Sequence, residues 1–236
     1  MKKLFIFLLI FSLLFLTSCT DTDDASEPFS SDFEITHRDT SPTSVIINPD
    51  YIGETKVFDS DAINFSDIES FFRKTLFSSD HTTVSLPSDT VKVALTGSYT
   101  AADIDALDRV CEMLNSVASF VGIKEVLPSE ADYTVNYGDD ESFVIKYSQY
   151  GTVSGAEITV PHTLTEDERF ALLSASLLRV CGFLNKCETT LDSALSVSEP
   201  APYITDTDLL LLDILYSVGE SGMSEQEFID AVKNYF

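Results

Sequence analysis

Residues 165–181 read TEDERFALLSASLLRVC and form the most informative stretch of the chain. The stretch opens with a capping box, because Thr165 stands three residues before Glu168. Gly182 follows it in the position of a left-handed helix C-cap. Beyond the first turn almost every residue is apolar, so no polar face is left to meet water. We therefore predict a nearly buried helix over 165–181.

The same N-terminal signature, a Ser or Thr followed three residues later by an acid, recurs along the chain. The further pairs are Ser66 with Glu69, Thr100 with Asp103, Thr205 with Asp208, and Ser224 with Glu227. Gly122 and Gly219 stand where left-handed C-caps would end two of these helices. The signals predict helices over 66–78, 100–121, 205–218 and 224–234.

Short runs rich in β-branched and aromatic residues lie between these helices and are typical of strands. They cover residues 91–95, 133–137, 143–147 and 156–160. The turn over 138–141, Gly-Asp-Asp-Glu, predicts that the second and third runs pair as a hairpin. The order of elements predicts an α+β domain, in which a small mixed sheet of about four strands packs with about five helices.

The first eighteen residues are typical of an export signal. Two lysines precede an uncharged apolar run over 4–16, which is shorter than the roughly 18 to 20 residues that span a bilayer. Residues 16–19, Leu-Thr-Ser-Cys, resemble a bacterial lipobox, in which the cysteine is acylated and becomes the N-terminus. The resemblance implies a lipoprotein signal peptide over 1–18 and a diacylglyceryl and palmitate anchor on Cys19. The protein would then be held at the extracytoplasmic face of the cell membrane. The alternative is a plain secretory signal with an incidental cysteine.

Residues 19–44 are rich in Asp, Ser, Thr, Glu and Pro, which predicts an acidic flexible tether. Its acids do not form an EF-hand loop, since the turn glycine and the distal glutamate are absent. The remaining residues, 45–236, are enough for a single α+β domain.

Composition excludes one class of partner. The chain holds 14 Lys and Arg against 39 Asp and Glu, a formal charge of −25, with 44% apolar residues. This is the composition of a globular protein, and such an excess of anions excludes nucleic acid as a partner.

The C-terminal half resembles a known bacterial family. Residues 151–160, GTVSGAEITV, fit its Gly-x-(aliphatic)-x-x-Ala-x-Ile-x-(aliphatic) edge strand and lead into the apolar helix described above. Residues 208–216, DLLLLDILY, and 222–224, GMS, follow in the same order and spacing. Together these segments resemble domain-of-unknown-function family 2927 over residues 91–236, and the architecture of that family is similar to zincin metallopeptidases. The resemblance implies a degenerate zincin-like domain.

A zincin helix needs His-Glu-x-x-His, which puts two ligands one turn apart and a glutamate beside the zinc-bound water. With Gly182 as the glycine of the extended motif, the ligand positions fall on Ala175 and Arg179, the general base on Ser176 and the third ligand on Asn185. Alanine and arginine cannot bind zinc, and serine cannot replace a carboxylate base. We therefore expect a vestigial site with no metal, no cofactor and no catalytic residue. Arg179 either pairs with a buried acid or caps a carbonyl, or its cation binds an anionic ligand in the vestigial cleft.

Other reactive residues form no recognisable motif. The histidines lack ligand spacing and are expected at the surface: His37, His81 and His162. Cys111 and Cys181 occupy apolar helix positions, where a free thiol is ordinary. A disulfide between Cys181 and Cys187 is also compatible with export.

These observations favour a lipid-anchored extracytoplasmic protein that binds or scaffolds at the cell envelope, with a protein, peptide or glycan as ligand. The alternative is a metallopeptidase-like or other hydrolase at the cell surface. Such an enzyme would draw its ligands from distant parts of the sequence or use chemistry without a recognisable motif.

Overall fold

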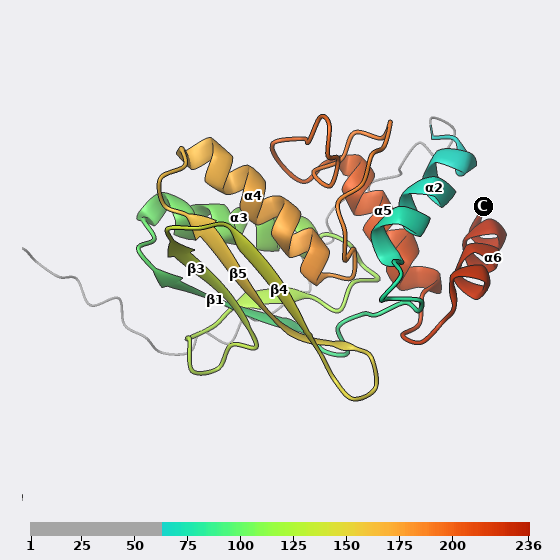
Figure 1. The fold of residues 1–236 in the computed structure, drawn as a ribbon, viewed down its shortest axis with the longest axis horizontal. Helices are drawn as coiled ribbons and strands as arrows, with labels where there is room; N and C mark the ends of the chain where they lie inside the picture. The colour runs from blue at the N-terminus through green and yellow to red at the C-terminus, as the bar shows by residue number, and fades with distance from the viewer. Residues whose placement is uncertain (1–62) are drawn as a thin grey trace, which may run out of the picture. The chain divides into compact units, whose positions relative to one another are not determined.

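A five-stranded mixed sheet forms the framework of the fold in this computed structural model, which describes residues 63–236 (Figure 1). Its strands are β1 (Val91–Gly97), β2 (Ile123–Glu125), β3 (Tyr133–Gly138), β4 (Ser142–Tyr147) and β5 (Val153–Pro161). They lie in the order β2-β1-β3-β5-β4. All neighbouring pairs are parallel except β4, which runs antiparallel to β5. The predicted signal peptide and tether, with Cys19 and His37, and the start of the predicted domain lie outside the described residues.

The predicted hairpin of residues 133–137 with 143–147 is wrong, because β5 lies between β3 and β4. Residues 151–160 are likewise not an edge strand. Val153, Ala156, Ile158 and Val160 are all buried, which suits an inner strand. β4 is the edge strand, and its residues alternate between exposed and half-buried. β4 is joined to β5 by a turn in which Gly151 adopts a φ of 76°. The antiparallel hairpin is therefore formed by β4 and β5, and not by β3 and β4 as the sequence indicates.

Five helices accompany the sheet: α2 (Phe65–Leu76), α3 (Ala101–Asn115), α4 (Glu166–Val180), α5 (Asp206–Val218) and α6 (Glu225–Tyr235). The predicted capping boxes begin α4, α5 and α6, with side chains and backbone bonded reciprocally. At α3, the Asp103 carboxylate accepts the Thr100 N–H at 2.8 Å. At α2 the prediction is wrong, because Asn64 is the N-cap and accepts the Ser66 N–H at 3.1 Å.

α3 ends at Asn115 rather than at 121. The Asn115 side chain pairs with the backbone of Ile123, donating to its carbonyl and accepting from its N–H at 2.8 Å each. This exchange ties the helix end to β2, the strand that the sequence did not reveal. Gly122 has a positive φ but lies beyond the helix, and Gly219 caps α5 with an ordinary φ of −85°. Of the three predicted left-handed caps, only Gly182, the residue after the C-cap Cys181, lies at the end of its helix with a positive φ.

The helices form two groups (Figure 1). α3 and α4 lie side by side on one face of the sheet, and α4 is buried from Leu173 to Leu178, as the sequence predicts. α2, α5 and α6 gather beyond the C-terminal end of α4. An aromatic cluster joins α2 to α6 and to the segment after α4: Phe72 lies 5.1 Å from Phe228 and Phe71 lies 5.8 Å from Phe183, measured between ring centroids. In the described part of the chain, no helix has the length and apolar character needed to cross a membrane.

Candidate functional site

The four positions that the family resemblance assigns to zinc ligands and their base lie on α4 and in the turn after it. Ala175 and Ser176 are each only 3% exposed, so neither faces an open cleft. Arg179, one turn further along, is half-buried. Asn185 is joined through its backbone N–H to the Thr75 carbonyl of α2 at 3.0 Å. The backbone therefore directs this segment toward α2.

These residues do not fit a zinc ion. Zinc sites use imidazole, thiolate or carboxylate ligands, and none of the four positions supplies one. A guanidinium at the position that the resemblance assigns to the second histidine would also repel the metal. Within residues 63–236, no group of three or more His, Cys, Asp or Glu side chains is placed to hold a metal ion.

Arg179 bridges α4 and the edge strand β4. Its Cζ lies 3.5 Å from the ring centroid of Phe143, so the planar cation stacks on that ring. Its Nε donates a hydrogen bond to the Leu184 carbonyl at 3.0 Å. The interpretation that Arg179 caps a carbonyl is therefore confirmed, and no carboxylate of the described residues forms an ion pair with it.

Burial lowers the pKa of Arg179. Removal of the guanidinium from water lowers its pKa to about 10, and the negative charges of Glu141 and of ionised Tyr147 oppose this drop. The side chain still carries its proton at neutral pH. The site is therefore a partly desolvated cation packed against an aromatic ring.

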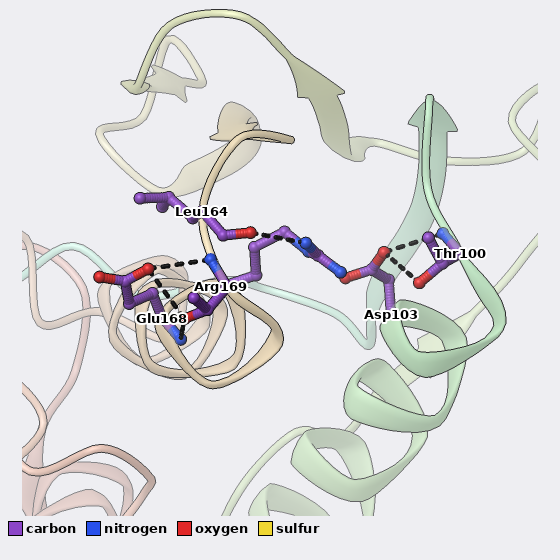
Figure 2. Close-up of polar contacts among 6 residues, drawn as sticks. Thr100, Asp103, Leu164, Glu168 and Arg169 are labelled. Carbon is purple, nitrogen blue, oxygen red and sulfur yellow. Dashed lines mark hydrogen bonds and ion pairs between the residues drawn. The ribbon is translucent and has the colours of Figure 1, made fainter.

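A buried ion pair between Arg169 and Asp103 joins the starts of α3 and α4, as Figure 2 shows. The Arg169 Nε donates to the Asp103 carboxylate at 2.8 Å, and an Nη donates to the Leu164 carbonyl at the same distance. Asp103 also accepts from the N–H and hydroxyl of Thr100. Both charged side chains are almost wholly buried, with side-chain exposures of 10% for Arg169 and 4% for Asp103.

The hydrogen bonds to Asp103 outweigh its desolvation. Burial alone would raise the pKa of its carboxyl, but the bonds from Arg169 and Thr100 bring it below its ordinary value. The Tyr137 hydroxyl is buried nearby and has no partner of hydrogen-bonding geometry among the described atoms. Burial raises the pKa of Tyr137, and the Asp103 charge adds to that rise. This group is closed to solvent and fixes the two helices rather than a ligand.

Asp208 is a second buried acid, and it holds the loop before α5. Its carboxylate accepts from Ser193 Oγ at 2.5 Å, from the Ala194 N–H at 3.0 Å and from the Thr205 N–H at 3.0 Å. Burial raises its pKa, and these bonds oppose the rise only in part. The sequence indicated the box with Thr205 but not the bonds to Ser193 and Ala194, since those partners lie outside any local pattern.

The remaining reactive residues do not converge on a site. Cys111, Cys181 and Cys187 are buried free thiols, so the disulfide that the sequence allowed is not formed in this structure. His162 is exposed, as predicted, and one ring nitrogen lies 2.7 Å from the Gly138 carbonyl. His81 is half-buried rather than fully at the surface, and its ring lies 4.4 Å from that of Tyr147.

Comparisons with known proteins give a fold likeness only. No protein-family model matches the chain, and no curated protein matches it. An archaemetzincin from Methanopyrus kandleri is similar to it in structure, with 14% identity and a TM-score of 0.35 over 53% of this chain and 94% of that one. High choriolytic enzyme 1 of the medaka Oryzias latipes, a hatching enzyme zinc-protease, is also similar, with 9% identity and a TM-score of 0.37 over 60% of this chain and 97% of that one. The chain is thus an α+β protein with distant structural similarity to zincin-like metalloproteases.

Proposed function

We propose that this chain is a lipid-anchored protein of the extracytoplasmic membrane face that binds a segment of another protein without cutting it. One observation carries the binding role: a half-buried arginine, Arg179, stacks on Phe143. The family resemblance assigns a zinc ligand to this position. A cation there can attract an anionic group, but it cannot activate a water molecule as zinc does.

The edge strand β4 supports a protein ligand over a glycan. Within the described residues β4 pairs only with β5, so its other edge presents backbone N–H and C=O groups that no described strand uses. An extended segment can add to such an edge as a further strand and gain main-chain hydrogen bonds. Val144 is 52% exposed on the outer face of β4 and offers apolar contact beside that edge.

The anchor is testable through Cys19, because acylation requires its thiol. The variant Cys19→Ala should leave the membrane fraction and accumulate as precursor or in the medium, without incorporating labelled fatty acid. Cys111→Ala is the matched control and should be labelled and fractionate like the original chain. Fatty acid on the Cys19→Ala variant would contradict the lipoprotein assignment.

The absence of catalysis is testable with the full chain in detergent. We expect no cleavage of casein or of a peptide library above the blank, with or without added zinc, because Ala175 and Arg179 supply no ligand and Ser176 no base. The variant Arg179→Ala should behave in the same way. Cleavage that a chelator abolishes and zinc restores would establish a hydrolase instead.

A further inference from the structure

Arg179 differs from the other arginines of the described region. Arg73 forms ion pairs with Glu69 and Glu225, and Arg169 pairs with Asp103. Arg109 is exposed and lies over the ring of Phe170, where water solvates its charge. Among the arginines of residues 63–236, only Arg179 is both partly buried and without a carboxylate within ion-pair distance.

The geometry of Arg179 leaves one part of its cation available. Phe143 covers a face of the guanidinium, and the Leu184 carbonyl occupies Nε. The N–H groups of Nη1 and Nη2 have no hydrogen-bond partner among the described residues. That pair of nitrogens presents parallel donors at the spacing of two carboxylate oxygens.

A bound carboxylate would also relieve an electrostatic cost. Burial disfavours the charged form of Arg179, and the acid that acts on it, Glu141, is exposed and beyond ion-pair distance. Tyr147, the other titratable group that acts on Arg179, is neutral at pH 7 because a phenol ordinarily ionises only at about pH 10, and burial raises its pKa further. An anion from outside the chain would supply the missing counter-charge in a partly desolvated site, where ion pairs are stronger than in water.

The position of Arg179 along β4 determines which terminus of an added peptide would lie beside it. Phe143 is the second residue of β4, so Arg179 lies near the start of that strand. A segment that pairs antiparallel to β4 runs in the opposite direction and brings its C-terminal end to this start. A parallel segment would bring its N-terminal end there. We infer that Arg179 binds the carboxylate of a peptide segment added antiparallel to β4, with the C-terminal carboxylate as the favoured source. This inference rests on the proposed peptide-binding function.

Three pools of acetylated hexapeptides test this inference with the immobilised full chain. The first pool has a free C-terminal carboxylate and contains no Asp or Glu, and the second is identical but ends in an amide. The third ends in an amide and contains Asp and Glu, which separates side-chain carboxylates from the C-terminal one. Mass spectrometry of the retained peptides should show about tenfold more of the first pool than of the second, the ratio expected for one charge-assisted hydrogen-bonded pair.

Two variants identify the residue responsible. Arg179→Gln keeps a donor for the Leu184 carbonyl, and it should reduce the preference for the acid pool to about one. Arg109→Met removes the other arginine that stacks on an aromatic ring, and it should leave the preference unchanged. Circular dichroism should show that both variants melt as folded proteins, and the comparison of pools on the original chain holds even if Arg179→Gln does not fold.

Other results of the peptide experiment would contradict either the carboxylate assignment or peptide binding itself. Equal retention of the acid and amide pools would overturn the carboxylate assignment and leave peptide binding standing. A preference that persists in Arg179→Gln would assign the carboxylate to another group. Stronger retention of the third pool than of the first would replace the C-terminal carboxylate by Asp or Glu side chains. Retention of none of the pools would overturn peptide binding itself and favour a glycan ligand.

Discussion

Removal of either charge of the Asp103–Arg169 pair should destabilise the fold by about 3 to 5 kcal/mol, because the remaining charge would stay buried without a partner. The pair lies at 2.8 Å between α3 and α4, the two helices that cover the sheet. Chemical denaturation of Arg169→Met and of Asp103→Leu measures the effect. The double variant should recover most of the loss, since an apolar pair of similar volume leaves no charge unpaired.

The pH dependence of this effect has a definite sign. The pKa of Asp103 is lowered in the folded state, so its charge contributes stability above the unfolded pKa and loses that contribution as the pH falls through the folded pKa. The difference in unfolding free energy between the original chain and Asp103→Asn should therefore be largest at neutral pH and shrink in acid. Glu168→Ala, which removes an exposed capping acid beside the pair, is the control and should cost much less. A midpoint of Arg169→Met equal to that of the original chain would show that the pair does not hold the helices together.

The second large effect is expected at Leu177, which is 0% exposed in the last turn of α4. Leu177→Ala should lower the unfolding free energy by about 2 to 5 kcal/mol, from lost burial and from the cavity that remains. Leu127→Ala is the matched control, because Leu127 is 60% exposed and its loss should change stability by less than about 0.5 kcal/mol. Equal midpoints for the two variants would contradict the central place of α4 in the core.

The helices were predictable where a local signal marks their start. Thr165, Thr205 and Ser224 act as N-caps because a hydroxyl and an acid three residues later satisfy free N–H groups, and all of these atoms lie within one turn. Strand pairing is not local. β2 has only three residues, two of them charged. Such a short segment cannot show the alternation of apolar and polar residues by which a strand is recognised in a sequence. The hairpin of β3 with β4 was predicted from a turn, whereas burial of the apolar residues of β5 decides which strand lies between them.

In the candidate site, too, local features were predictable from the sequence and contacts between distant residues were not. Counting from Gly182 assigns Arg179 to a zincin ligand position by resemblance, and this assignment stays a prediction. Capping of a carbonyl is one of the interpretations that the sequence allows for Arg179. The Phe143 ring that stacks on Arg179 belongs to β4, a strand that the sequence predicts, but no local pattern indicates that this strand contacts the end of α4. The partners Asp103 and Arg169 are separated by 66 residues and were unpredictable as a pair, although each lies in the first turn of a predicted helix.

Zinc content tests most directly the claim that Arg179 replaces a metal centre. The full chain, purified in detergent, incubated with zinc and then dialysed, should hold no stoichiometric zinc by mass spectrometry, and Arg179→Gln should give the same result. One tightly held zinc ion per chain in the original protein would contradict the account.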